Sequence, residues 1–311
     1  DGLLVAGLTA QDVERLDYSE GGFDYALTQV TLETGASAQV YLPAPNAWTL
    51  EEPWDFDGWV RQWGDMTVYA AREVMGYFGI RTPEDVARMF PMIRARAWSR
   101  INAATARHGA GTLQGDLEVE TSDRVYANYF ALDEIRLRHA RFDGGMSPPV
   151  LRAVLQAPDA VLVLPYDPVR DRVLLVEQFR AGPLARGDRT VWQFEPIAGR
   201  IDPGEAPEDT ARREAMEEAG LELGTLYPVA ESYCSPGTST EFFYIYVGLA
   251  ELPDDVTGVA GLDSEHEDIR SHLMGFDALM EMCDAQQAAN APLVLTAYWL
   301  SRHRERLRNT S

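Results

Sequence analysis

The N-terminal third of the chain passes from short β-type segments to a helical pattern. Short apolar segments predict strands at 3–8, 26–34 and 37–43. Apolar residues then recur every three to four positions, which predicts one helix across 59–79 and a second across 82–106. A Thr-Pro pair opens the second helix, a favourable start. A small β-rich domain with a helical connector is therefore predicted over residues 1–110.

The rest of the chain carries a longer, mixed pattern. A glycine-containing segment at 108–116 is the best linker candidate, and a second domain is predicted over 111–311. Strand patterns occur within 126–142, 161–179, 191–199 and 227–250, residues 147–156 are irregular, and helical patterns occupy 276–286 and 292–308. Strands and helices interleave without regular alternation. The predicted fold class is therefore α+β, with a mixed sheet between helices instead of a doubly wound parallel sheet.

Composition and charge restrict the class of protein. The 311 residues are 46% hydrophobic and 24% charged, values ordinary for a globular chain that buries a core without disulfides. A formal net charge of -22 argues against nucleic acid and anionic membrane surfaces as partners, because both are bound through basic surface. Cys234 and Cys283 show neither metal-ligand spacing nor a disulfide framework. A reducing, cytoplasmic location is expected.

One acidic segment carries the strongest chemical signal. It places Glu214, Glu217 and Glu218 at spacings of three and four residues, so on a helix the three carboxylates share one face. Left unpaired, acids this close repel one another, and bound divalent cations would remove the repulsion. Arg213 is expected to pair with Glu205 and to hold the acidic face in place.

The ends of this segment suit a helix, and its chemistry suits phosphate hydrolysis. Pro207 fits the first turn, and Gly220 fits a left-handed C-terminal cap. Mg²⁺ prefers oxygen ligands and commonly joins protein carboxylates to substrate phosphates. Metal ions neutralise phosphoryl oxygens and activate water. The segment therefore favours a site for divalent cations over the alternative of a solvated surface helix.

Residues 199–221 resemble the Nudix box. The spacing is Gly, five residues, Glu, seven residues, Arg-Glu, apolar, any, Glu-Glu, any, Gly, apolar, and every fixed position is filled. From about Asp116 to Arg308 the chain resembles a Nudix hydrolase. The resemblance implies an α/β/α sandwich with a mixed sheet, preceded here by the smaller β-rich domain and the helical connector.

Three further features resemble the ADP-ribose pyrophosphatase branch of that family. They are a Leu-Leu-Val-Glu-Gln-Phe-Arg segment ending at Arg180, Pro236 lying 16 residues after Gly220, and an acidic segment at 265–270. The resemblance implies hydrolysis of ADP-ribose to AMP and ribose 5-phosphate with Mg²⁺, for which Mn²⁺ is a possible substitute. It also implies a homodimer.

The resemblance assigns roles to individual residues. The metal ligands would be the carbonyl of Ala198 and the carboxylates of Glu214, Glu217, Glu218 and Glu267. The catalytic set would be Glu265 as the base that activates water, with Glu217, Arg213 and Glu205. Substrate contacts would come from Arg180, Glu195, Pro236 and Glu241. The alternatives are an exposed acidic loop for Glu265 and Glu267, a surface arginine for Arg180, a structural contact for Glu195 and an ordinary turn for Pro236.

The first region resembles the later half of the γ-glutamylcyclotransferase-like (AIG2-like) family, in truncated form. The match covers residues 5–43, and Glu20 falls where that family has its catalytic acid. The family's substrate-binding loop is absent from this sequence. Glu20 is therefore expected to be a glutamate beside a turn, without catalytic action.

Two alternatives to an ADP-ribose hydrolase stay open. One is a Nudix hydrolase of another nucleoside diphosphate derivative, such as a nucleotide sugar. The other is a module that senses a nucleotide without cleaving it. Sensors are expected to lose catalytic carboxylates, and this chain keeps them.

Overall fold

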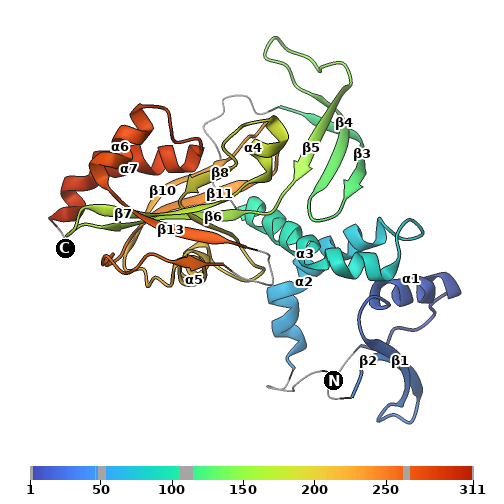
Figure 1. Ribbon diagram of the computed structural model, residues 1–311. Helices are drawn as coiled ribbons and strands as arrows, with labels where there is room; N and C mark the ends of the chain where they lie inside the picture. The colour runs from blue at the N-terminus through green and yellow to red at the C-terminus, as the bar shows by residue number, and fades with distance from the viewer. Residues whose placement is uncertain (1–2, 46, 48–53, 106–114, 262–266, 310–311) are drawn as a thin grey trace. The chain divides into compact units, whose positions relative to one another are not determined.

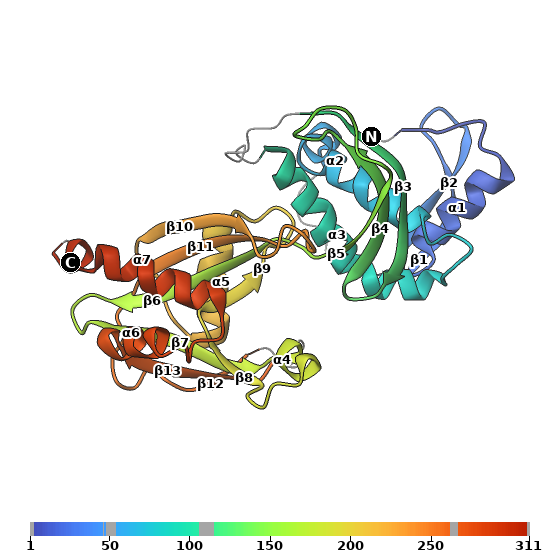
Figure 2. The ribbon, with the colours of Figure 1, turned by 90° about the horizontal axis from the view of Figure 1, so that it is seen from above.

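The computed structural model describes residues 3–45, 47, 54–105, 115–261 and 267–309. Its internal contacts divide the chain into two compact units, Asp1–Gln156 and Ala157–Ser311. Each unit has its own helices and sheets, which Figures 1 and 2 show from two directions.

The first unit combines three helices with two small antiparallel sheets. Its elements are α1 (Ala10–Glu20), β1 (Tyr25–Thr31), β2 (Ser37–Pro43), α2 (Phe56–Met75), α3 (Pro83–Thr105), β3 (Leu117–Ala127), β4 (Ala131–His139) and β5 (Val150–Gln156). Strand β1 pairs with β2, and β4 lies between β3 and β5. The core forms where α2 and α3 meet the β3–β4 turn, through residues such as Val74, Ile93, Ala127 and Ala131. The two predicted helices of this region are confirmed.

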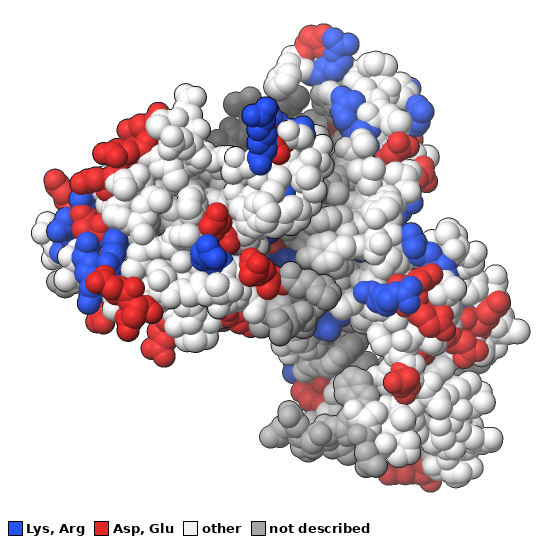
Figure 3. All heavy atoms as spheres, viewed as in Figure 1, with Lys and Arg blue, Asp and Glu red and all other residues white. Residues whose placement is uncertain are grey.

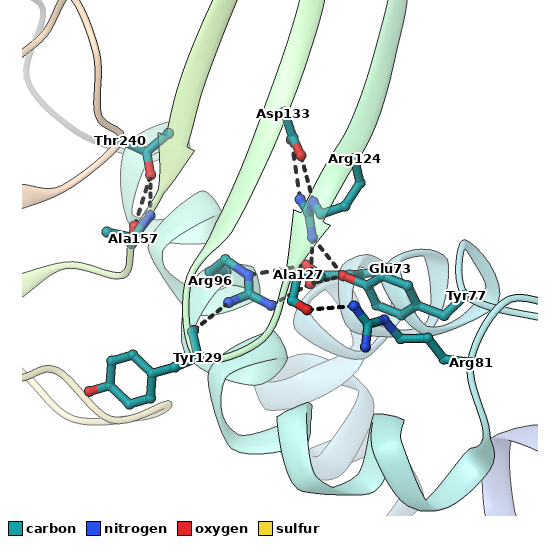
Figure 4. A network of polar contacts seen from close by, with 10 residues as sticks. All are labelled: Glu73, Tyr77, Arg81, Arg96, Arg124, Ala127, Tyr129, Asp133, Ala157 and Thr240. Atoms are coloured by element: carbon teal, nitrogen blue, oxygen red, sulfur yellow. Dashed lines mark hydrogen bonds and ion pairs between the residues drawn. The ribbon is translucent and has the colours of Figure 1, made fainter.

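A polar network joins the helices of this unit to its larger sheet (Figure 4). Glu73 on α2 pairs with Arg96 on α3 and, at 2.6 Å, with Arg124 on β3. Arg124 also pairs with Asp133 on β4 and donates to the hydroxyl of Tyr77 over 3.1 Å. The Arg96 side chain is 5% exposed and that of Glu73 is 16% exposed, so these charges depend on one another for compensation.

The division between the units differs from the boundary predicted at residue 110. Ala127 and Ala131 belong to the core that α2 and α3 build, and Arg124 is bound to Glu73. Strands β3–β5 therefore group with the preceding helices. The sequence pattern places the change of composition at the linker, whereas the contacts place the division at Gln156.

Two local predictions in this unit are wrong. Residues 3–8 form no strand, and Leu3 and Leu4 are 78% and 62% exposed. They pair with no strand among the described residues, and a capping box between Thr9 and Asp12 starts helix α1 directly after them. Residues 147–156, predicted to be irregular, contain β5, because β4 supplies a ladder partner from Ala131 to Leu137.

The second unit is a sheet covered by helices on both faces. Its elements are β6 (Ala160–Asp167), β7 (Arg172–Phe179), α4 (Ala181–Arg186), β8 (Trp192–Glu195), β9 (Ile197–Arg200), α5 (Pro207–Ala219), β10 (Leu226–Tyr233), β11 (Phe242–Leu249), β12 (Val259–Ala260), β13 (Ile269–Gly275), α6 (Phe276–Asp284) and α7 (Ala291–Arg308). The strand order is β10-β11-β6-β7-β13-β12, with β8 on β7 and β9 on β6. Strand β11 runs parallel to β6, and the other pairs are antiparallel.

The layers follow from which strand faces are apolar. Helix α5 packs on one face against β6 and β9, and α6 and α7 pack on the other (Figure 1). Leu164, Leu175, Leu279 and Leu300 are fully buried between the sheet and α6–α7. The predicted α/β/α sandwich with a mixed sheet is confirmed. On the face drawn in Figure 3, acidic and basic side chains lie close together over the end that carries α6 and α7.

The predicted hairpin of residues 161–179 is β6–β7. Tyr166 pairs with Val173 and Asp167 with Arg172 across its turn. Both cysteines are free thiols. No described helix is both long and apolar enough to cross a membrane.

Candidate active site

Helix α5 carries the acidic face and has the ends that the sequence predicted. Pro207 stands in its first turn, and Gly220 ends it at φ 61°, the left-handed conformation that glycine adopts without strain. Ala211 and Ala215 are fully buried, so the helix lies close to the sheet. The carboxylates are thus presented by a rigid element that tertiary packing holds in place.

The acids of α5 are tied together by Arg213. Its Nη1 donates to Glu214 over 2.8 Å and to Glu217 over 3.0 Å, and its Nε donates to Glu205 over 2.9 Å. The hydroxyl of Thr210, a residue that the sequence analysis did not single out, donates to Glu205 over 2.8 Å. The predicted pairing of Arg213 with Glu205 is confirmed, and Arg213 fixes two more carboxylates at once.

Strand β9 approaches α5 closely enough to exclude any side chain at Gly199. A Cβ built there would lie 1.8 Å from Oε1 of Glu214. The neighbouring Ala198 N–H donates to Oε2 of Glu218 over 3.4 Å. Ala198 and the α5 carboxylates, predicted to act together, are therefore adjacent in space.

Burial makes two of these carboxyl groups weaker acids than usual. Burial raises the pKa of Glu218 to about 9, and the charges of Glu214 and Glu267 add to the rise. Burial also raises the pKa of Glu214 to about 7, against the lowering effect of Arg213 and with additions from Glu217 and Glu267. Closely spaced carboxyl groups in a buried position favour the bound proton, or a cation in its place.

The donor chemistry of this cluster fits a hard divalent cation. All side-chain donors are carboxylate oxygens, and burial raises the pKa of Glu218, and of Glu214 despite its pairing with Arg213, so a cation at this place would offset their negative charge. In the part of the chain that the structure describes, no group of three or more His, Cys, Asp or Glu side chains is already arranged around one ion position. Arg213 pairs with Glu214 and Glu217 instead.

Arg180 and Glu195 form a second charged pair beside the acidic cluster. Arg180 follows β7, and its Nε and Nη2 donate to the Glu195 carboxylate at 3.0 and 2.6 Å. Glu195 is 6% exposed. Burial alone lowers the pKa of Arg180, but Glu195 and the charges of Glu218 and Glu267 raise it overall. Both residues were predicted to contact substrate. In the structure they form an ion pair with each other.

A pocket of about 450 Å³ opens next to this pair. Its walls are Arg180, Pro183, Arg186, Asp188, Gln193, Glu195, Ala289 and Asn290. Sequence reasoning named Arg180 and Glu195 but missed Arg186, Asp188, Gln193 and Asn290. No motif marks these positions, because the walls come from α4, β8 and the turn before α7.

The other predicted residues occupy different places. Pro236 lies exposed in the turn between β10 and β11, and the backbone carbonyl of Glu241 accepts from Cys234 over 3.2 Å. Glu267 lies within the described residues, and its charge raises the pKa of Glu214 and of Glu218. Glu265 lies outside the described residues. Glu20 ends α1 in the first unit, and burial raises its pKa.

Comparisons with known proteins show which family the chain resembles. A family profile described as NUDIX domain matches residues 156–295. An ADP-ribose pyrophosphatase of Escherichia coli (strain K12) is 38% identical over 196 residues, which cover 63% of this chain and 93% of that protein. A GDP-mannose pyrophosphatase of Escherichia coli O139:H28 (strain E24377A / ETEC) is 32% identical over 173 residues, covering 56% of this chain and 88% of that protein.

Among solved structures, one described as "Crystal structure of ADP compounds hydrolase" is 19% identical with a TM-score of 0.48, and covers 62% of this chain and 98% of that chain. The filled Nudix box on α5, the domain match and the extent of the 38% identical relative agree with one another. The chain therefore belongs to the Nudix family, within the branch that includes ADP-ribose pyrophosphatases.

Proposed function

We propose that this protein hydrolyses the diphosphate of ADP-ribose to AMP and ribose 5-phosphate. The observation that carries the proposal is the set of α5 carboxylates, held by Arg213 and pressed against β9 at Gly199. The similarity to ADP-ribose pyrophosphatases supports the substrate.

The proposed cofactor is Mg²⁺, with Mn²⁺ as a substitute. The carbonyl of Ala198 and the carboxylates of Glu214, Glu217, Glu218 and Glu267 would hold it. When bound, such an ion neutralises the phosphoryl oxygens and makes water more acidic. The raised pKa values of Glu214 and Glu218 support a cation at this place.

The chain's own residues would position and polarise the reactants. Arg213, anchored by Glu205, keeps the acidic face aligned. Glu265 would take the proton of the water as its oxygen attacks one phosphorus and the bridging P–O bond breaks. Arg180, beside the cluster, would contact the substrate. Pro236 and Glu241 would contribute from the β10–β11 turn.

A second candidate is hydrolysis of a nucleotide sugar. The similarity to a GDP-mannose pyrophosphatase favours it, because that relative is matched over 88% of its length. The α5 carboxylates would serve either substrate, so the choice depends on the surrounding pocket.

The test is a panel assay on the purified full chain. ADP-ribose, GDP-mannose, ADP-glucose and NADH would each be incubated with Mg²⁺ or with chelator, and the monophosphate products detected through coupled phosphatase. We expect the highest kcat/KM for ADP-ribose and no hydrolysis with chelator. Faster cleavage of a nucleotide sugar would favour the second candidate. Binding of ADP-ribose without cleavage would identify a sensor.

We also propose that the protein is a cytoplasmic homodimer whose first unit serves assembly. The two free thiols support the location. Large apolar side chains exposed on β3, including Leu117, Val119 and Tyr126 at 64%, 56% and 55%, support an interface in the first unit. The γ-glutamylcyclotransferase-like origin of its N-terminal part stays a prediction. Light scattering over a concentration series would contradict the dimer if the mass stayed that of one chain.

A further inference from the structure

We propose that the pocket beside Arg180 holds the terminal sugar of the nucleoside diphosphate, and that Asp188 selects this sugar through its hydroxyl groups. This inference rests on the proposed function and deepens it, since it names the part of the substrate that this pocket takes. The residues that carry it are Asp188, Gln193 and Asn290, none of which belongs to the acidic cluster.

The pocket adjoins the place where the diphosphate would be cleaved. Arg180 lines it, and the same side chain experiences the charges of Glu218 and Glu267. Glu195, the partner of Arg180, also lines it and lies three residues before Ala198. A group bonded to a phosphate at the α5 carboxylates is therefore within reach of the pocket.

The charges of the pocket walls favour an uncharged occupant. Arg180 is neutralised by Glu195, and Arg186 pairs with Asp188. Two arginines and two carboxylates in these pairs leave the walls with no net charge, so nothing there attracts a phosphate specifically. The occupant is thus an uncharged end of the substrate, either the sugar or the nucleobase.

The chemistry of the walls favours the sugar over the base. Six of the eight wall residues are polar or charged, and none is aromatic. Nucleobases are commonly held by stacking on aromatic rings, whereas hydroxyl groups need hydrogen-bond donors and acceptors. Gln193 donates its amide to Thr190 over 2.7 Å, and the Asn290 oxygen accepts from Leu293 over 2.9 Å. These bonds orient both amides, and among the described residues no bond to the other polar atom of either amide is found, so that atom can meet a ligand.

The backbone holds Asp188 in its position. Gly187 ends α4 at φ 90°, and its N–H bonds to the carbonyls of Pro183 and Leu184. The Asp188 N–H also donates to Pro183 over 2.9 Å. Two consecutive residues are therefore anchored to one turn, which places the carboxylate at the pocket wall.

The experiment compares two ligands that differ only in the sugar. ADP-ribose and the β-methyl ester of ADP carry the same base and the same phosphate charge, so the repulsion by the acidic cluster cancels in the comparison. Their affinities for the full chain would be measured by ligand-observed NMR titration in chelator, and kcat/KM for ADP-ribose with Mg²⁺. Asp188→Asn removes the charge at constant size, and Gln193→Ala provides a second variant.

We expect Asp188→Asn to weaken ADP-ribose binding about tenfold or more, because a hydrogen bond to a charged group is lost, and to change the methyl ester less than about twofold. Asp143→Asn is the matched control, since Asp143 also pairs with an arginine two residues earlier but lies in the first unit. It should change neither affinity.

Three outcomes would overturn the inference: equal losses for both ligands, no loss for either, or wild-type protein that binds ADP-ribose no tighter than the methyl ester. Sugar-dependent binding without hydrolysis by wild-type protein would keep the inference and refute the proposed function. Hydrolysis with unchanged affinity in Asp188→Asn would keep the proposed function and refute the inference.

Discussion

At the scale of single residues, Glu218 is the most buried of the α5 acids, and its pKa is raised the most. It is 2% exposed, and its carboxylate has only a backbone N–H from Ala198 as a described partner at 3.4 Å. An ionised carboxyl group in such a place costs free energy unless a cation compensates it. Among the α5 acids, Glu218 is therefore the residue for which we expect a bound cation to matter most.

Glu218→Gln should separate activity from folding. The substitution keeps size and removes the charge, so we expect turnover to fall at least ~100-fold at fixed Mg²⁺ while the fold persists. Steady-state hydrolysis of ADP-ribose and circular dichroism would measure the two effects. An unchanged rate would remove Glu218 from the mechanism.

The same variant should flatten the pH dependence of stability in metal-free protein. The folded state of the wild type keeps the Glu218 proton up to a pKa of about 9, whereas the unfolded chain releases it near 4.5. The native state thus binds more protons in this window, and the free energy of unfolding falls as pH rises through it. Urea denaturation in chelator at about pH 6 and about pH 8.5 would measure the slope. If the free energy of unfolding changed with pH as steeply in the variant as in the wild type, the raised pKa of Glu218 would be contradicted.

Gly199→Ala tests the close approach of β9 to α5. The added Cβ would meet the Glu214 carboxylate, so that side chain has to move. We expect kcat to fall about tenfold to a hundredfold through the misplaced carboxylate. Gly275→Ala, where a Cβ meets nothing within 4 Å, is the control and should keep full activity.

At the scale of elements, the second unit is closed by a contact between the β6–β7 hairpin and helix α7. Asp171, at φ 56° in the hairpin turn, accepts from Tyr166 over 2.7 Å and from Arg308 over 2.8 Å, and it also pairs with Arg304. Burial raises the pKa of Asp171, but these partners lower it overall. The stability that they contribute is present at neutral pH and is lost as pH falls.

Asp171→Asn should destabilise the protein without a change of backbone. Asparagine tolerates the left-handed conformation, so the expected loss of about 1–3 kcal/mol in unfolding free energy comes from weaker bonds to Arg304 and Arg308. Urea denaturation at neutral pH would measure it. Asp254→Asn breaks the pair between Arg172 and a carboxylate that is 93% exposed, and should leave stability unchanged. Equal effects of the two variants would refute the role of Asp171.

At the scale of the whole molecule, the candidate active site and the Glu73 network lie in different compact units. Every described residue of the candidate active site lies in Ala157–Ser311. The Glu73 network lies in Asp1–Gln156 and joins α2, α3 and the β3–β4 pair. Stability of the first unit and chemistry of the second are therefore expected to respond to different substitutions.

Glu73→Gln should lower stability but spare catalysis. It leaves Arg96 and Arg124 without their shared carboxylate, and breaking such a buried pair typically costs about 3–5 kcal/mol. Limited proteolysis and urea denaturation would detect the loss, while kcat/KM at moderate temperature should match the wild type. Arg88→Gln, which breaks an exposed pair with Asp85, is the control. A large fall in kcat/KM of folded Glu73→Gln would show that the units depend on each other.

Prediction from sequence succeeded where the signal was local. The caps of α5, the Arg213–Glu205 pair and the two helices of the first unit follow from spacings of a few residues, and the structure confirms them. Helix α1 was missed although its signal, Thr9 followed by Asp12 three residues later, was present. Asp188 and Asn290 were not predicted. They line the same pocket but lie about a hundred residues apart in the sequence, so no local pattern connects them.

By itself, the sequence determined the acidic face, the helix that carries it and the family to which the chain belongs. Residue spacing defines a helix face before any tertiary contact exists. Only the tertiary structure decided that Arg180 is bound to Glu195, that Glu218 is buried enough to favour its proton, and that β3–β5 join the first unit. These properties depend on burial and on neighbours distant in sequence, which only the packed chain supplies.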